Sequence, residues 1–361
     1  MANRVFFLAF FHFAIIVGFS SGLDTAILAD LPTSNLAGAW ADLLSLVDAH
    51  KGDSKPAIQK LKSYFVDFGY LGNSTLTADL SFDDALEAAV RLYQQNFHLP
   101  VTGNLDSATI AQLVTPRCGG IDVDPSGVSQ MLQNLTHPGT SHFVKHYSFF
   151  PGTPRWVSKR SLTYAFDQST TSLASGIPLN SLRTAFSRGF QRWANIVPLT
   201  FTETSSISSA DIVIAFAGFD HGDRHPFDGQ MGVLAHAFAP EDGRFHLDSS
   251  ESWSVNVRSA TSLAAIDLES VVTHEIGHLI GLGHSGDSAA IMFPSIAPRQ
   301  IKTAFGQDDI DGAQALYGAN PNFVPGSTTG TDSNVQSSSS WKATFSCWHL
   351  LVLLVLAKIL L

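Results

Sequence analysis

The amino-acid sequence predicts an α+β protein in which a small domain of three helices precedes a larger domain of strands and helices. The first observation is a helical spacing of apolar side chains between about residues 55 and 115. The second is an alternation of period two that begins near residue 160, with a helical segment between two such strands. With 361 residues and 45% hydrophobic content, the chain is long enough to bury two separate cores.

Three segments predict the small domain. Apolar residues recur at helical spacing from Ala57 to Phe68, and Gly69 follows as a stop. Ser81 is placed to cap a second helix over Phe82 to Phe97, and a shorter third helix follows over Leu105 to Leu113. Because the apolar stripes carry no polar cluster, we expect this domain to contribute packing rather than chemistry.

The larger domain follows a stretch rich in glycine, proline, serine and threonine, Gly119 to Pro154, which we interpret as a linker. Large apolar side chains then alternate with smaller ones over Leu162 to Phe166 and again over Ile212 to Phe216, as expected of strands. Between them, Asn180 is placed to cap a helix that continues past Trp193. The order strand, helix, strand predicts a mixed α/β or α+β domain.

Composition and charge exclude one class of partner. The formal net charge is -10 and the isoelectric point is about 5.7. No run of Lys and Arg stands out, and phosphate binding requires such a surplus. We therefore expect no nucleic-acid partner.

The amino-terminal segment predicts entry into the secretory pathway. Residues 1–22 combine an arginine, an apolar run and small residues, which is typical of a signal peptide. Two glycosylation sequons begin at Asn73 and Asn134. Both features predict a secreted glycoprotein.

The carboxy-terminal segment predicts attachment to a membrane. Residues 321–340 form a Ser/Gly-rich stalk, and residues 341–361 form a short apolar tail. This order matches a GPI-anchor signal with attachment near Ser337, and a transmembrane tail is the alternative. The two cysteines, Cys118 and Cys347, would ordinarily pair, but removal of the tail would leave Cys118 as a lone thiol suited to bind a metal or to react.

One motif carries the chemistry. His274 and His278 are four residues apart, so on a helix they face the same ion. Two glycines then let the chain turn back to present His284 as a third ligand, which leaves one zinc position open for water. Glu275 is placed to act as the general base for that water, and Met292 follows where the extended motif has its Met-turn.

A second group of metal-binding residues lies upstream of this motif. Four protein ligands leave no open position, which suits a structural zinc, and a solvated acidic loop is the alternative. The four candidate ligands are His221, Asp223, His236 and His246. Oxygen donors that could hold calcium are interleaved with them at Asp228, Asp248 and Glu251.

Taken together, these motifs resemble the matrix metalloproteinases, and in particular the plant members of that family. The segment Pro116 to Asp122 is similar to the cysteine-switch motif of the family's propeptide. The resemblance implies that the Cys118 thiolate occupies the fourth position of the catalytic zinc and excludes the water that Glu275 must activate. It also implies a metzincin catalytic domain, with a twisted, mostly parallel sheet, helices and a Met-turn.

The resemblance extends to the second group of residues. It implies that His221, Asp223, His236 and His246 hold a structural zinc. It also implies a calcium site with these ligands: Asp228, Gly229, Met231, Val233, Asp248 and Glu251. A second calcium would use Asp211.

The same resemblance assigns substrate-binding segments. Gly232 to Phe238 resembles the edge strand to which an extended peptide adds through backbone hydrogen bonds. Pro294 to Ile296 resembles the wall of the pocket that follows the scissile bond, which in the family prefers apolar residues such as leucine. Asp308, in the closing helix, would receive the new amino terminus after activation.

These interpretations predict a secreted, cell-surface zinc endopeptidase that is made as a latent zymogen and cleaves extracellular proteins. We expect a propeptide over residues 23–146, with its helical domain at about 55–115, and a catalytic domain over residues 147–320 without a hemopexin domain. The expected location is the extracellular face of the plasma membrane or the extracellular matrix. Because residues 55–115 resemble a peptidoglycan-binding fold, the alternative is a non-catalytic cell-wall or matrix binding protein that keeps zinc for structure.

Overall fold

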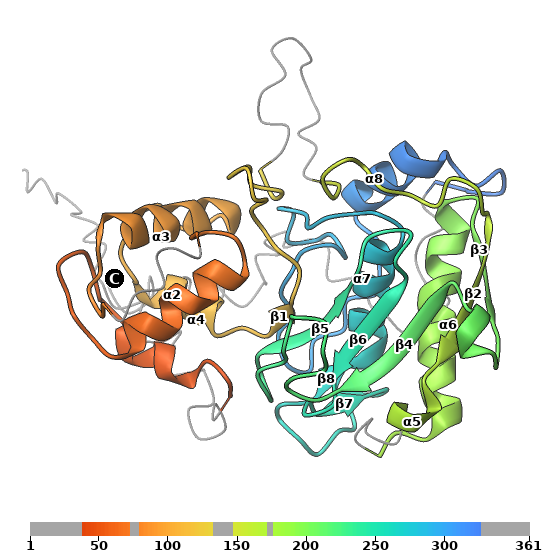
Figure 1. Ribbon diagram of the computed structural model, residues 1–361, viewed down its shortest axis with the longest axis horizontal. Helices are drawn as coiled ribbons and strands as arrows, with labels where there is room; N and C mark the ends of the chain where they lie inside the picture. Colours follow the sequence, from red (N-terminus) through yellow and green to blue (C-terminus); the bar gives the residue numbers. More distant parts are fainter. Residues whose placement is uncertain (1–37, 73–78, 133–146, 172–175, 326–361) are drawn as a thin grey trace, which may run out of the picture. The chain divides into compact units, whose positions relative to one another are not determined.

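The computed structural model describes residues 38–72, 79–132, 147–171 and 176–325 (Figure 1). The predicted signal peptide, both sequon asparagines, most of the stalk, the GPI attachment residue and the apolar tail lie outside these residues. Within the described residues, no helix is both long and apolar enough to cross a membrane.

The small domain contains the three predicted helices and one element that the sequence analysis missed. The helices are α2 (Ala57–Asp67), α3 (Asp84–Asn96) and α4 (Ser107–Leu113), and a short 3₁₀ helix, η1 (Ala41–Leu46), precedes them. Their apolar faces enclose one core that is rich in aromatic rings. Tyr93 lies within it, with its ring centroid 5.6 Å from that of Phe65 and 5.4 Å from that of Tyr70.

Two predicted helix caps are wrong. Helix α3 is capped by Asp83, whose carboxylate accepts a hydrogen bond from the Leu86 backbone N–H at 2.8 Å, whereas Ser81 bonds to a preceding aspartate. Helix α6 (Leu179–Ile196) begins after Pro178, so Asn180 lies inside the helix rather than at its cap. In both cases another residue within two positions of the expected one starts the helix. In α3 it is an aspartate that accepts a hydrogen bond, and in α6 it is a proline with a fixed φ.

The larger domain contains five strands of a six-stranded, mostly parallel sheet, as predicted, and the sixth, β1, comes from the segment before it. The order of the strands in the sheet is β1-β5-β6-β4-β2-β3, and only the β5–β6 pair is antiparallel. Its strands are β1 (Arg117–Cys118), β2 (Ser161–Phe166), β3 (Thr200–Glu203), β4 (Ile212–Ala217), β5 (Val233–Ala237) and β6 (Arg244–Asp248). The remaining short elements are α5 (Gln168–Thr171), η3 (Ile207–Ser209), β7 (Trp253–Ser254) and β8 (Ile266–Asp267).

Helices α6 and α7 (Leu268–Leu279) pack side by side next to the sheet, and α8 (Gln307–Tyr317) closes the domain (Figure 1). Trp193 of α6 is fully buried and donates its indole N–H to the Thr273 carbonyl of α7 at 2.8 Å. A Cβ at Gly277 would lie 2.2 Å from Met292 Sδ, so only a glycine lets the chain at Met292 pass this close to α7. The core therefore holds α7 in a fixed position.

Strand β1 lies just before the segment 119–154 that the sequence analysis interprets as a linker, and its hydrogen bonds extend to Gly119. The backbone N–H groups of residues 117 and 119 donate to the carbonyls of Gly232 and Ala235, at 3.1 and 2.8 Å. On its other side, the N–H of Cys118 donates to the Pro294 carbonyl at 2.9 Å. The backbone of the first residues after the helical domain is therefore hydrogen-bonded to segments on both sides. These bonds satisfy its polar groups although the sequence resembles a loop.

Candidate active site and metal centres

Helix α7 carries the first two histidines of the motif. Asp267 starts the helix by accepting a hydrogen bond from a first-turn backbone N–H at 2.9 Å. His274 and His278 lie one turn apart and are both buried. Past the end of α7, Gly281 has a φ of 106°, a conformation that favours glycine, and the chain returns to bring His284 to the same place.

The three imidazole rings are oriented by hydrogen bonds at their Nδ1 atoms. Each Nδ1 lies 2.8 Å from an oxygen: His274 from the Ile291 carbonyl, His278 from the Leu282 carbonyl, and His284 from the Asp122 carboxylate. These acceptors place the ring hydrogen on Nδ1 and leave a lone pair on each Nε2. Burial lowers the pKa of His278 to about 3 and also lowers those of His274 and His284, so the rings are neutral at pH 7.

The Cys118 sulfur joins these nitrogens. It lies 3.3 Å from His278 Nε2, which in turn lies 3.1 Å from His274 Nε2, and the four ligand atoms are within 4.8 Å of one another. His284 Nε2 is buried without a hydrogen-bond partner among the described residues. Lone pairs that converge in this way repel one another unless a cation lies between them. The donor set, three imidazoles and one thiol, therefore fits a four-coordinate zinc.

Glu275 lies in the same enclosed space. Its side chain is completely buried, and burial raises its pKa to about 8. Burial and the charge of Glu275 together raise the pKa of the Cys118 thiol well above its ordinary value. A metal ion would reverse this effect on the thiol, because a coordinated thiol loses its proton.

Two residues that support the site were missed in the sequence analysis. Arg117 is fully buried and contacts Asp122 through two hydrogen bonds of 2.6 and 2.9 Å. Although burial alone would raise it, Arg117 and His284 hold the pKa of Asp122 well below its usual range. Asp122 is thus the charged acceptor that orients the third histidine, and it comes from the propeptide segment. The bracketing of Cys118 by an arginine and an aspartate was the available signal.

Asp309 supports the chain beneath the histidines and was also missed. Its carboxylate accepts hydrogen bonds from the backbone N–H groups of Ile291 at 2.7 Å and Met292 at 3.0 Å. These bonds hold the Ile291 carbonyl where it accepts from His274. Met292 itself is buried under α7 at the position where the Met-turn is predicted.

The structure also brings the second group of predicted ligands together. Their ligand atoms lie within 4.8 Å of one another, around one oxygen of Asp223. That oxygen is 3.0 Å from His221 Nε2, 2.8 Å from His236 Nε2 and 2.8 Å from His246 Nδ1. Burial lowers the pKa of His236 to about 4, so this ring is neutral at pH 7. A closed set of three imidazoles and one carboxylate fits a structural zinc.

The predicted calcium ligands come from the loop that leads into β5 and from the end of β6 with the residues just after it. Asp248 and Glu251 are buried, and burial raises the pKa of Glu251 to about 8, with Asp248 adding to the effect. Burial likewise raises the pKa of Asp228 to about 6. Met231 adopts a φ of 64°, in the region that favours glycine. For the second calcium, Asp211 forms an ion pair with Lys159, so its carboxylate is already neutralised.

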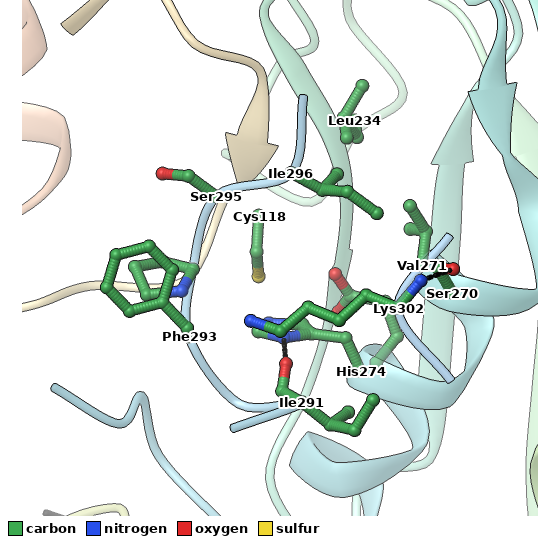
Figure 2. Close-up of a pocket in the computed structure, with 12 residues that line it drawn as sticks. Cys118, Leu234, Ser270, Val271, His274, Ile291, Phe293, Ser295, Ile296 and Lys302 are labelled. Atoms are coloured by element: carbon green, nitrogen blue, oxygen red, sulfur yellow. Dashed lines mark hydrogen bonds between the residues drawn. The ribbon is translucent and has the colours of Figure 1, made fainter. Parts of the chain in front are cut away.

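A pocket of about 320 Å³, counting its open mouth, lies beside the catalytic groups (Figure 2). Its walls include Leu234 of β5, Val271 of α7 and the segment from Phe293 to Ile296. Figure 2 shows the Cys118 sulfur directed into this space. The predicted pocket wall and edge strand thus border the same site as the zinc ligands.

Asp308 lies where the sequence analysis expected a partner for the mature amino terminus. Its carboxylate accepts a hydrogen bond from the backbone N–H of Tyr147 at 2.8 Å and another from the Ser285 hydroxyl at 2.6 Å. The start of the predicted catalytic domain is therefore already held against α8.

The fold and the two histidine clusters define a zinc-dependent peptidase with a helical propeptide. The sequence profile of the matrixins matches residues 155–318, and that of a peptidoglycan binding domain matches residues 54–113. The chain is 46% identical to metalloendoproteinase 5-MMP of Arabidopsis thaliana, over 79% of this chain and 77% of that protein. It is 43% identical to 2-MMP of the same plant, over 89% and 87%, and 42% identical to metalloendoproteinase 1 of Glycine max, over 75% and 85%.

The chain therefore belongs to the matrixin family of metallopeptidases. It is a zinc metalloendopeptidase, and a helical domain of the peptidoglycan-binding type precedes its catalytic domain. The non-catalytic alternative does not fit this membership.

The buried pair between Arg117 and Asp122 generates the first prediction. In the zinc-loaded precursor, Asp122→Asn should lower the free energy of unfolding by about 3 to 5 kcal/mol, because it leaves the guanidinium buried without a counter-charge. Urea denaturation followed by tryptophan fluorescence measures this. As a control, Asp84→Asn changes a carboxylate that is 86% exposed and should cost no more than about 0.5 kcal/mol. Equal stability of the two variants would contradict the assignment.

Proposed function

We propose that this protein is secreted as a latent zymogen and, once activated, cleaves extracellular proteins at internal peptide bonds. The observation that carries the proposal is the position of the Cys118 sulfur, within 4.8 Å of the three histidine nitrogens and in the space that Glu275 faces. A thiolate there would complete the zinc ligands and leave no room for water.

In the active form, His274, His278 and His284 would hold the catalytic zinc. When bound, the zinc supplies a Lewis acid that polarises the scissile carbonyl and lowers the pKa of the attacking water. Glu275 accepts the proton of that water at its carboxylate and later donates it to the leaving amine. Burial raises the pKa of Glu275 to about 8, and the positive charge of a bound zinc would lower it again, so that the carboxylate can act as a base.

Latency also involves the backbone. Strand β1 pairs with β5 and with the segment at Pro294, so it fills the groove into which a peptide would add as a strand. Removal of the propeptide would free the edge of β5 and the pocket at once. The contact between Asp308 and Tyr147 supports activation by cleavage close to residue 147.

We propose a structural zinc held by His221, Asp223, His236 and His246, and a calcium ion in the neighbouring loop. Burial and mutual repulsion of three carboxylates support the calcium. Asp228, Asp248 and Glu251 are desolvated and repel one another, and a divalent cation would relieve both effects. The carbonyls of Gly229, Met231 and Val233 are the proposed remaining ligands. Calcium at Asp211 is the weaker extension, given its pairing with Lys159.

The proposed location is the extracellular face of the plasma membrane. The signal-like residues 1–22, the sequons at Asn73 and Asn134, and the apolar residues 341–361 support secretion, glycosylation and a GPI anchor near Ser337. Relatives named as matrix metalloproteinases support an extracellular substrate.

The role of Glu275 generates the second prediction. Glu275→Gln should retain zinc, measured by mass spectrometry of the metal, but should lower kcat/KM on a quenched peptide by about 10² to 10⁴-fold, because the amide cannot accept the proton. Glu203→Gln, which changes an exposed glutamate on β3, should leave both readouts unchanged. Retained activity in Glu275→Gln would refute the assignment of the base.

The role of Cys118 generates the third prediction. The Cys118→Ser precursor should cleave the peptide without treatment, because a neutral hydroxyl is a poor zinc ligand compared with a thiolate. The wild-type precursor should stay silent until a thiol-reactive mercurial is added, and a zinc chelator should abolish the activity of both. If the serine variant is folded and remains latent, Cys118 does not maintain latency.

A further inference from the structure

One lysine lies among the residues that line the pocket beside the catalytic groups. Of the twelve lining residues, Lys302 is the only lysine or arginine. Its neighbours in the lining include the apolar side chains of Leu234, Val271, Ile291 and Ile296. An ammonium group in such surroundings is desolvated, and this costs free energy unless an anion or an acceptor approaches it.

Lys302 is held in place at both of its ends. Its backbone N–H donates to the Ser270 hydroxyl at 2.7 Å, which ties it to the first turn of α7. Its Nζ lies 5.1 Å from the centroid of the Phe293 ring, on the segment that forms the pocket wall. Figure 2 shows the side chain extended between these two elements. The ammonium is therefore directed across the pocket by contacts at both ends.

Glu275 is the one carboxyl among the lining residues of the pocket, and it forms no ion pair with this ammonium. Among the ion pairs and hydrogen bonds of the described residues, none involves Lys302 Nζ. Asp287 and Asp309 act on it only through longer-range attraction, and the Asp309 carboxylate already accepts the backbone N–H groups of Ile291 and Met292. Burial lowers the pKa of Lys302 to about 8.

We propose that Lys302 is a specificity-determining residue: it makes the pocket select a substrate side chain that ends in a hydrogen-bond acceptor, glutamate or glutamine, over an apolar one of the same length. This inference rests on the proposed peptidase function of the site. The apolar walls cover the methylene stem of such a side chain, and its terminal oxygen accepts from the ammonium. It differs from the simple preference for leucine that the family resemblance implies.

The experiment compares four quenched peptides that differ only in the residue after the scissile bond: leucine, methionine, glutamine and glutamate. Methionine matches glutamine in length, so the ratio of their kcat/KM values isolates the terminal acceptor. In the mercurial-activated wild type, the glutamine and glutamate peptides should be cleaved at least as well as the methionine peptide. In Lys302→Met, both ratios to methionine should fall by about tenfold, the size of one charge-assisted hydrogen bond.

Two further variants make the result specific. Lys302→Arg retains the positive charge and should retain the preference for glutamate. Lys159→Met is the matched control, because Lys159 is the other lysine of residues 147–320 and its side chain is 55% exposed on the surface. It should leave all the ratios unchanged.

Unchanged ratios in Lys302→Met, or an equal loss on all four peptides, would overturn the proposal. A wild type that cleaves the methionine peptide far better than the glutamine and glutamate peptides would overturn it as well, even if the Lys302 variants fail to fold. Failure of the activated wild type to cleave any of the peptides would instead count against the proposed function itself.

Discussion

The convergence of four metal-binding atoms is the constraint on which the rest of this structure depends. Three histidine nitrogens and the Cys118 sulfur, which come from a helix, a returning loop and the propeptide, lie within 4.8 Å of one another. Each imidazole presents a lone pair, because its other nitrogen is committed to a fixed acceptor. Lone pairs held this close repel one another, and this costs free energy unless a cation binds between them. The core around Trp193 and Met292 fixes α7, and it therefore holds His274 and His278 in position to bind the metal.

The propeptide supports this metal centre with other side chains besides the Cys118 thiol. Arg117 stacks on Phe68 of the helical domain, with its guanidinium carbon 3.7 Å from the ring centroid, and pairs with Asp122. Asp122 also orients His284, so one short segment places a ligand and holds the ring of another. A buried ion pair contributes little net stability, but it defines one geometry. Release of this segment would remove the thiol and the orienting carboxylate together.

The sequence predicted most of the fold and both ligand clusters, because the spacing of histidines on a helix and the alternation of strands are local patterns. It did not predict the caps of α3 and α6, where neighbouring residues compete for the same role, or the pairing of residues 117 and 118 with β5. Asp309 and Lys302 are charged residues whose spacing signals no role. Asp122 stands in the motif around Cys118, but the sequence does not show which group its carboxylate contacts. Their roles arise only when segments far apart in the chain meet in one buried place.

X-ray absorption at the zinc edge of the purified, untreated precursor is the most direct measurement of the central feature. With two zinc ions per chain, one sulfur at about 2.3 Å should contribute half a sulfur ligand per zinc on average. The sulfur contribution should vanish in Cys118→Ser, while the histidine contribution remains. A precursor with two bound zinc ions and only nitrogen and oxygen ligands would contradict the coordination of the metal by Cys118.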